Sequence, residues 1–481
     1  MYFHWITGGK VLNLHPQVRR RSEWHFNPNS DPENTPSSAG TPRIFVLADD
    51  LTGAADAAPY FHRDDNQVRI GFHGQLGWSS ALDSGGVQIV DTETREVSKQ
   101  EAYVRVLSVA TQLASVIATV HVPGEQPIWI YKKVDSTLRG HLGTEIVATL
   151  RGLNRCLALL APTFPQNGRV VRDGELYVNG ILVNQTDFAQ DPNHPIQSSG
   201  VSELVNSGGE LVTYGISLVT LRSGVEGVLR VLRGFEQDAR FQGKPGVVIA
   251  DAESAADLAT LAQAMVRRPE IVPCGSAGFA KALADVWLPV GTPATVLPGS
   301  VRQVLLLLGS ANPTAHRQFE RLAQEMPTLA LTLPAEEFSE EQTSSARMEA
   351  VFRDMQVSKH SVLALRIGQT RVGPVVSQRA LRGLVELAVN WLRQPMRLNL
   401  HPASVSSNLA VIASGGDTAI ALCRSLEVTA LWPQGELVSG MPWSFADSPL
   451  GRFLLVTKAG GFGEDDTFVV STKRLLGIGT P

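Results

Sequence analysis

The chain has 481 residues, 43% of them hydrophobic and 18% charged, and it carries a formal net charge of −4. This length predicts two domains, and the charge gives no reason to expect nucleic acid as a partner. The three cysteines lie far apart, without the spacing of a metal site or a disulfide framework, which favours a reducing, cytoplasmic location. No continuous apolar run approaches the roughly 18 residues of a membrane span, so we expect no membrane partner.

The first part of the chain, residues 1–42, differs in amino-acid composition from the rest. An acid-free stretch that contains Arg19, Arg20 and Arg21 is followed by a segment rich in Pro, Ser and Asn. Such segments bury too little apolar surface to fold, so we predict a disordered extension. A transit peptide is the alternative, which Pro16 and a poor amphipathic pattern disfavour.

From residue 43 onward, short apolar runs alternate with longer stretches of helical periodicity. The runs include RIFVLA, GVQIV, PIWIYKKV, CLALLAP, GVVIA, QVLLLLGS, SVLALRIG and NLAVIASGG. Continuous apolar runs are typical of strands buried on both faces, as in parallel sheets covered by helices. A segment rich in Pro and Gly, residues 288–300, indicates a domain boundary. We therefore predict an α/β protein with domains at 43–290 and 300–478, each with a largely parallel sheet flanked by helices.

The first predicted strand, residues 43–48, runs into the adjacent carboxylates Asp49 and Asp50. Ligands of open α/β sheets bind beyond the carboxyl ends of the strands, so this pair is a candidate site. Because side chains alternate along a strand, we expect Asp50 to face a substrate while Asp49 supports the turn. The alternative is plain N-capping of the following helix by an Asp or by Thr52.

Two further strand ends carry groups suited to an anionic ligand. The segment KKVDSTLRG places Lys133, Asp135 and Ser136 after an apolar strand, and TETR places Arg95 after another. Lys and Arg bind carboxylates, and Arg does so in a bidentate manner. The alternative is a solvated patch of ion pairs. A later segment, APTFPQNGRVVRDGELYVNG, contains Arg169 and a hairpin-like sequence, and we interpret most of it as ordinary turn chemistry.

Three strand and glycine-loop units follow in the C-terminal half, namely LLLLGSANPTAHRQ, VIASGGDTAIALCRSL and LLVTKAGGFGEDDT. Glycine loops that lead into helices expose N–H groups that bind phosphate oxygens. Ser310, Ser414 and Thr418 add hydroxyl groups, and Asp417 is a candidate to orient Mg²⁺ or a ribose. None of the three loops has the GxxxxGK[ST] pattern of a P-loop. Together they predict a nucleotide-binding site.

These segments, in this order, resemble the four-carbon acid sugar kinase family. The likeness covers about residues 43–475 and rests on ADDLTGAAD, TETR, KKVDSTLRGHLGTE, APTFPQNGR, DGELYVNG, GSAGFAKAL, GSANPTAHRQ, SGGDTA and TKAGGFG. Members of that family phosphorylate four-carbon aldonates such as threonate, erythronate and 3-oxo-tetronate with ATP. The resemblance implies an N-terminal acid-sugar domain, a C-terminal nucleotide domain and an active site in the cleft between them. TETR departs from the usual family sequence, and the extension has no family counterpart.

The resemblance also assigns residues to the two ligands. It implies acid-sugar contacts at Asp50, Arg95, Lys133, Val134, Asp135 and Ser136, and ATP contacts at Ser310, Gly415, Gly416, Asp417, Thr418 and Gly461, to which we add Ser414 and Gly460 from the same loops. Phosphoryl transfer needs positioning and charge neutralisation, so Mg²⁺ is expected beside ATP, with no ligands assigned to it. Asp50 is the predicted general base, and Asp135 is the reserve candidate.

Two other functions remain as alternatives. An NAD-dependent dehydrogenase of small hydroxy acids is disfavoured because no GxGxxG opens a βαβ unit with an acidic residue downstream. A non-catalytic sensor that binds an acid sugar and a nucleotide is the other. A homodimer is left open as the assembly.

Overall fold

The described part of the chain consists of ten stretches of the computed structural model. They are residues 42–63, 66–74, 86–120, 128–191, 194–206, 210–288, 301–338, 344–370, 372–393 and 409–478. The predicted extension and the predicted boundary segment lie outside these stretches, apart from Pro42 and Leu288. All the described residues belong to one compact unit, Gly40–Pro481.

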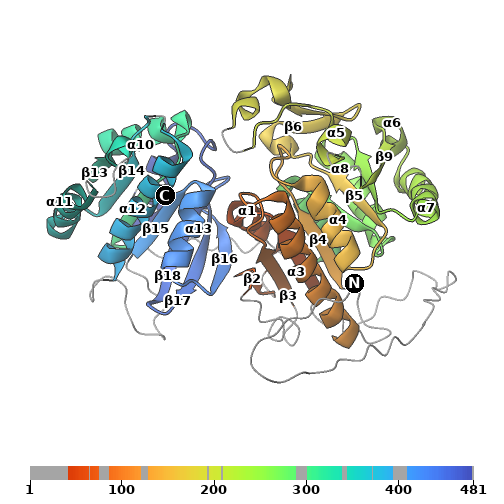
Figure 1. Ribbon diagram of the computed structural model, residues 1–481, viewed down its shortest axis with the longest axis horizontal. Coiled ribbons are helices and arrows are strands. Elements are labelled where there is room, and N and C mark those ends of the chain that lie inside the picture. The colour runs from red at the N-terminus through yellow and green to blue at the C-terminus, as the bar shows by residue number, and fades with distance from the viewer. Residues whose placement is uncertain are drawn as a thin grey trace. The chain divides into compact units, whose positions relative to one another are not determined.

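The N-terminal half is built on parallel strands whose carboxyl ends meet along one edge (Figure 1). In chain order these strands are β1 (Arg43–Ala48), β2 (Val68–Phe72), β3 (Gly86–Asp91), β4 (Trp129–Lys133), β5 (Leu157–Ala161), β9 (Val212–Ile216), β10 (Gly246–Ala250) and β11 (Val272–Gly275). Their order across the sheet is β2-β3-β1-β4-β11-β5-β10-β9. Strand β1 therefore lies inside the sheet, next to β3 and β4, and its loop faces the loops of both neighbours.

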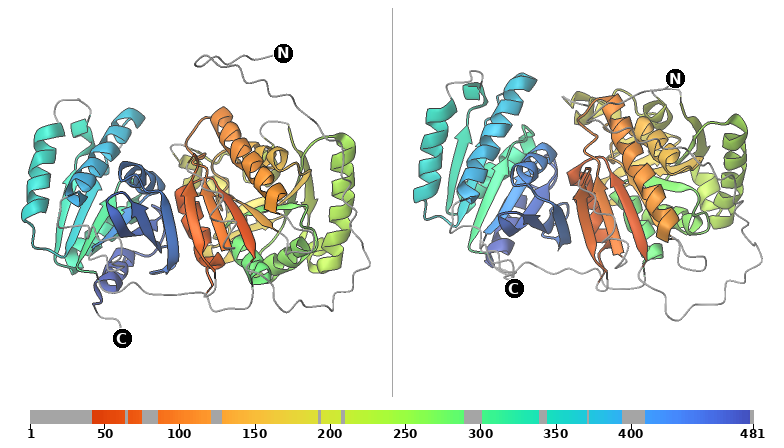
Figure 2. Two further views of the ribbon diagram at one scale, coloured as in Figure 1. Left: turned by 90° about the horizontal axis from the view of Figure 1, so that it is seen from below. Right: turned by 60° about the horizontal axis from the view of Figure 1, so that its bottom comes forward.

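Helices cover both faces of this part of the sheet (Figure 2). They are α1 (Leu51–Phe61), α3 (Lys99–Val120), α4 (Leu142–Gly152), α5 (Val201–Val205), α6 (Leu218–Arg222), α7 (Val225–Gln242), α8 (Ala255–Val266) and α9 (Ala277–Trp287). Because strand side chains alternate, Phe45 and Leu47 pack with residues of α3 and α4, while Ile44 and Val46 pack with residues of α1, α8 and α9. The two hydrophobic cores thus lie on opposite faces of the same strands.

Helix α3 has the length and composition that a membrane span could share. A window of 18 residues within Lys99–Thr119 has a mean hydropathy of 1.3. One face of α3, with Ala102, Val106, Ala110 and Leu113, is buried in the core shared with α4. This arrangement is that of a helix covering a sheet.

A small antiparallel sheet lies beyond the carboxyl ends of the parallel strands. Its strands are β6 (Arg169–Arg172), β7 (Glu175–Val178) and β8 (Ile181–Leu182), and the 3-10 turns η1 (Pro165–Asn167), η2 (Val183–Gln185) and η3 (Asp187–Gln190) flank it. The backbones of Val171 and Ala252 exchange two hydrogen bonds of 3.0 Å, and Asp251 accepts hydrogen bonds from the turn between β6 and β7. The predicted hairpin is confirmed and is anchored to the end of β10.

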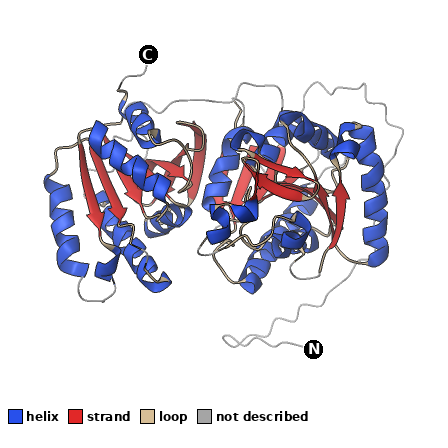
Figure 3. Ribbon diagram, turned by 90° about the horizontal axis from the view of Figure 1, so that it is seen from above, coloured by secondary structure: helices blue, strands red, loops and turns tan. Residues whose placement is uncertain are grey.

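The C-terminal half repeats the pattern with helices on both sides of its strands (Figure 3). Its strands are β12 (Gln303–Leu308), β13 (Thr328–Leu333), β14 (Val362–Ile367), β15 (Leu409–Ser414), β16 (Ala430–Glu436), β17 (Pro442–Ser448) and β18 (Gly451–Lys458). Its helices are α10 (Pro313–Glu325), α11 (Ser344–Val357), α12 (Pro374–Leu392), α13 (Gly416–Ser425) and α14 (Thr467–Leu476). The 3-10 turn η4 (Ala335–Phe338) follows β13. Strands β13-β14-β12-β15-β18 are parallel in that order, and β17 and β16 continue the sheet in antiparallel fashion.

The predicted α/β class, with largely parallel sheets flanked by helices, is confirmed. One feature was not predicted. Strand β16 pairs antiparallel with β2 at Leu431 and Ile70, so the described strands of both halves form a single sheet of 15 strands. The predicted domain limits and the predicted cleft remain predictions.

Candidate active site

The turn after β1 holds the two adjacent carboxylates. The side chain of Asp50 is the N-cap of α1, and its Oδ1 accepts a hydrogen bond of 2.7 Å from the backbone N–H of Gly53. Asp49 is only 3% exposed, and its Oδ1 has no hydrogen-bond partner in the described structure. Strand β1 ends at Ala48, so the alternation of strand side chains does not extend to these two residues. Asp50 therefore caps α1 through Oδ1, and its role toward a substrate stays a prediction.

Arg95, in the loop after β3, holds both carboxylates. Its Nε donates to Asp49 Oδ2 at 2.9 Å, and its Nη1 donates to Asp50 Oδ2 at 2.6 Å. Nη2 lies 2.8 Å from Asp49 Oδ2 and 3.9 Å from Asp135 Oδ1. The expected opposite orientation of Asp49 and Asp50 is therefore wrong, because one guanidinium contacts both side chains. The predicted roles, with Asp50 toward the substrate and Asp49 supporting the turn, stay predictions.

The end of β4 contributes two buried lysines with different surroundings. Lys132 Nζ forms an ion pair of 2.7 Å with Glu145 of α4, which makes it structural. Lys133 Nζ donates to the carbonyl of Val134 at 2.9 Å and, within the described residues, has no carboxylate oxygen within 4.0 Å. A Cβ on Gly53 would lie 3.0 Å from Lys133 Nζ and 2.7 Å from an Asp50 oxygen. The glycine at position 53 thus leaves room for this cation beside the first turn of α1.

The rest of the KVDS segment lies in the turn that follows β4. Val134 packs in the core and offers only its backbone, and Ser136 is half-buried. Asp135 accepts hydrogen bonds from Arg139 Nε at 2.9 Å and Nη2 at 3.0 Å, and from the hydroxyl of Thr137. These donors leave the Asp135 carboxylate with little capacity to accept further hydrogen bonds.

The two candidate general bases, Asp50 and Asp135, differ in the pKa that their surroundings give them. Burial raises the pKa of Asp135, but Arg139 and Arg95 beside it lower that pKa further, to well below the usual carboxyl value. For Asp50, burial and the neighbouring Asp49 raise the pKa more than Arg95 lowers it, so the net pKa lies above the usual value. A base with a raised pKa takes up a proton more readily, which favours Asp50 over Asp135.

Two side chains near this cluster were not among the predicted site residues. Asp56 lies two turns into α1, and burial raises the pKa of its carboxyl while the charge of Lys133 lowers it. Arg169, at the start of β6, has the charges of Asp135 and Asp56 acting on its guanidinium. The sequence could have indicated Asp56, because it lies three residues after Gly53 and therefore on the same face of the predicted helix. For Arg169 the sequence showed only a residue in a turn.

The C-terminal glycine loops lie at the carboxyl ends of β12, β15 and β18, which are adjacent strands. A Cβ on Gly460 would lie 2.4 Å from Ser310 Oγ, and a Cβ on Gly415 would lie 3.4 Å from Ser310 Cβ. Gly415 has a φ of 102° and donates its N–H to the carbonyl of Lys458 at 2.8 Å. The structure thus brings these three predicted loops together around Ser310.

The other predicted nucleotide residues surround this meeting point. Ser414 is fully buried, and its Oγ has no hydrogen-bond partner in the described structure. Thr418 is buried, whereas Asp417 is exposed in the first turn of α13. Gly461 is exposed, and a Cβ there would lie 2.9 Å from the side chain of Asn312. The N–H groups at the start of α13 are therefore flanked by hydroxyls and one exposed carboxylate.

The two halves of the site meet at Gly416, the first residue of α13. A Cβ on Gly416 would lie 3.4 Å from Asp50 Oδ2 and 3.0 Å from Thr52 Oγ1. The Thr52 hydroxyl is buried and has no hydrogen-bond partner in the described residues. The positive end of the α13 dipole therefore faces the carboxylate that caps α1.

Lys458, the last residue of β18, is a further group that was not predicted. It is 1% exposed, and its Nζ donates to the carbonyls of Ala459 and Gly460 at 3.0 and 2.9 Å. The ammonium lies 5.3 Å from the centre of the Phe468 ring, and burial lowers its pKa to about 7. Lys458 thus holds the loop that contacts Ser310.

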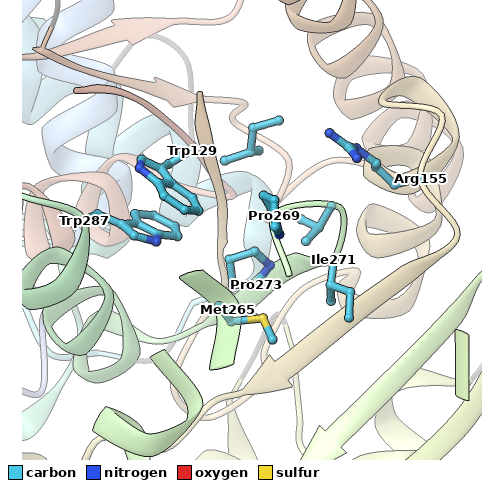
Figure 4. A pocket seen from close by; sticks show the side chains of 9 residues that line it. Trp129, Arg155, Met265, Pro269, Ile271, Pro273 and Trp287 are labelled. Carbon is cyan, nitrogen blue, oxygen red and sulfur yellow. The ribbon is translucent and has the colours of Figure 1, made fainter. Parts of the chain in front are cut away.

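No cluster of three or more His, Cys, Asp or Glu side chains with metal-binding geometry occurs among the described residues. A pocket lies at the opposite ends of the strands from the site and contains none of its residues (Figure 4). The stacked rings of Trp129 and Trp287, 5.0 Å apart, line it together with Met265 and Pro273. Its largely apolar lining is unsuited to a polar anion.

Two family models match the chain and define its class. One, described as a sugar-binding N-terminal domain, matches residues 44–283, and the other, described as a nucleotide-binding C-terminal domain, matches residues 305–468. The chain therefore belongs to the class of proteins that join these two domains. The acid and lysine cluster lies in the first matched segment, and the glycine loops lie in the second.

Relatives that are named for their activity identify the family within this class. A D-threonate kinase from Bordetella bronchiseptica is 31% identical over 91% of this chain and 98% of its own length. A D-erythronate kinase from Heliobacterium modesticaldum is 27% identical over 90% and 97%, and a 3-oxo-tetronate kinase from Pseudomonas fluorescens is 27% identical over 91% and 98%. This protein belongs to the four-carbon acid sugar kinase family.

A solved structure shares the fold. The crystal structure of a protein from Salmonella typhimurium LT2 covers 90% of this chain and 99% of its own chain, with a TM-score of 0.68 at 20% identity.

Proposed function

We propose that this protein is an ATP-dependent kinase that phosphorylates a hydroxyl group of a four-carbon acid sugar, namely threonate, erythronate or 3-oxo-tetronate. The observation that carries the proposal is the approach of Gly416 to Asp50, with 3.4 Å between the Cβ position of Gly416 and Asp50 Oδ2. This approach joins a carboxylate with a raised pKa to a helix N-terminus suited to phosphate. The activities of the relatives support it.

In the proposed reaction, a substrate hydroxyl oxygen attacks the γ-phosphorus of ATP and ADP leaves. The hydroxyl proton passes to the carboxylate of Asp50, whose position is held by Arg95 and by the N–H of Gly53. The N–H groups at the start of α13 and the hydroxyl of Ser310 bind phosphate oxygens. The chain's contribution is mainly positioning, which is what phosphoryl transfer requires.

Mg²⁺ fits this site as a partner of the phosphates. Mg²⁺ is commonly bound by one or two carboxylates together with substrate phosphates, so a dedicated cluster of ligands is not required. Asp417 is the exposed carboxylate at the start of α13 and is the residue we assign to it. When bound, the ion neutralises phosphate charge.

The test is ADP release from the purified full chain with D- and L-threonate, D- and L-erythronate and the 3-oxo acids. We expect ADP release with at least one acid and a clear preference among them. A flat response over the whole panel would contradict the assigned substrate class. Binding of an acid without ADP release would instead favour the sensor, and a change in absorbance at 340 nm with NAD would favour the dehydrogenase.

A further inference from the structure

Among the described residues, Arg169 differs from the other arginines of the site in having no carboxylate partner. Arg95 is paired with Asp49 and Asp50, and Arg139 is paired with Asp135. The guanidinium of Arg169 donates through Nη1 to the carbonyl of Asn167. Its Nε is buried without an acceptor, and within the described residues no carboxylate oxygen lies within 4.0 Å of it. A charged donor left in this state costs free energy unless a ligand supplies an acceptor.

The backbone around Arg169 is held firmly. Its N–H donates to the carbonyl of Phe164 at 3.1 Å, and its own carbonyl accepts from the N–H of Phe164 at 2.8 Å. The preceding Gly168 has a φ of 69°, and a Cβ there would lie 1.9 Å from Asn179 Oδ1. Only glycine allows this close turn, so the chain fixes where the Arg169 side chain begins.

The surroundings place Arg169 on the acid-sugar side of the site. It follows β5, whose carboxyl end lies on the same sheet edge as those of β1 and β4. Asp135 and Asp56 are the carboxylates whose charges act on its guanidinium, and Arg139 is the cation that opposes them. Asp56 also lies in the field of Lys133. Lys133 and Arg169 are thus two cations that share acidic neighbours and lack a carboxylate partner of their own in the described structure.

We propose that Arg169, together with Lys133, binds the carboxylate group of the acid sugar. A guanidinium and a carboxylate match in shape and charge, so an acid is preferred over a neutral polyol of the same length. The hairpin that begins at Arg169 is then the element that selects acids. This inference rests on the proposed function, because it names how that substrate is recognised.

The test compares the full-length wild type with Arg169→Gln and with Arg172→Gln. Arg172 is an exposed arginine on the same strand that pairs with Glu253, which makes it a matched control. Calorimetric titration measures the binding of D-threonate and D-erythronate, and of the neutral polyols threitol and erythritol. We expect Arg169→Gln to weaken acid binding about 30-fold, the loss of one charge-assisted contact, and to leave polyol binding unchanged. Arg172→Gln should bind the acids like the wild type.

Wild-type acid affinity in Arg169→Gln, or an equal loss of acid and polyol binding, would overturn the inference. So would a wild type that binds none of the acids. A second variant, Arg169→Lys, retains the charge but not the planar guanidinium, so it should weaken acid binding less than Arg169→Gln does, which guards against a folding defect in the first variant. A wild type that binds an acid but releases no ADP refutes the kinase proposal and leaves this inference standing.

Discussion

At the scale of single residues, Asp50 combines two roles that the sequence presents as alternatives. One carboxylate oxygen caps α1, and the other contacts Arg95 close to the start of α13. Capping fixes the side chain, and a fixed carboxylate is what a general base requires. The cap and the base are therefore compatible in one residue because a carboxylate has two oxygens.

Replacing Asp50 with Asn separates the two roles. Asn caps helices about as well as Asp, so we expect the variant to fold with the melting temperature of the wild type. Loss of the base should lower kcat on the order of 10²-fold or more, measured by ADP release. Turnover near that of the wild type would reassign Asp50 to capping alone.

The same residue predicts a pH dependence. Burial and Asp49 raise the pKa of Asp50, and the base acts only when ionised. We expect kcat/KM to fall as the pH is lowered through this raised pKa, at a pH above the usual carboxyl range. The residual activity of Asp50→Asn should lack this acidic limb, and a pH profile shared by both proteins would contradict the assignment.

At the scale of elements, the glycine loops act through close approach. Each loop follows a strand, and the loops meet because β12, β15 and β18 are adjacent in the sheet. The contact between Gly460 and Ser310 leaves no room for a side chain, since a Cβ would lie 2.4 Å from the Ser310 hydroxyl oxygen. Backbone N–H groups and one hydroxyl are thereby kept within reach of the same ligand.

Gly460→Ala should therefore displace the Ser310 hydroxyl. We expect the KM for ATP to rise on the order of tenfold, with a smaller effect on the KM for the acid sugar, in steady-state kinetics. Gly368→Ala is the matched control in the same half, because its Cβ would meet neighbours at 3.7 Å, an ordinary contact. Equal effects on both KM values would argue against the nucleotide assignment.

At the scale of the molecule, one continuous sheet joins the described strands of the two halves. Leu431 of β16 pairs with Ile70 of β2, and both are buried. An ion pair between Arg424 of α13 and Glu93, in the loop after β3, adds a second link. Because the link is mainly apolar and hydrogen-bonded, it should be sensitive to a buried charge.

Leu431→Asp introduces such a charge at the pairing of Leu431 with Ile70, which is the join between the two halves. We expect one calorimetric unfolding transition for the wild type and two for Leu431→Asp, with ATP raising the temperature of only one of the two. Val219→Asp, at a position that is 83% exposed, is the control and should keep one transition. A single transition in Leu431→Asp would show that the join does not couple the halves.

The fold class, the main elements and the family follow from the amino-acid sequence alone. The strand at 43–48 has the bounds that its continuous apolar run predicts, and α3 shows the periodicity of a helix buried on one face, because burial on two faces and on one face leaves distinct apolar patterns. The glycine loops were placed at strand ends for the same reason. These signals are local, and a single segment suffices to carry them.

Which groups meet depends on the tertiary structure. Arg95 is paired by Asp49 and Asp50, more than forty positions away along the chain, whereas Arg169 has no carboxylate partner among the described residues. Two arginines that look alike in sequence thereby have different partners in the structure. The pairing of β16 with β2 and the approach of Gly416 to Asp50 were equally beyond the sequence. Electrostatic and steric effects depend on distances in space, which the local pattern of residues does not contain.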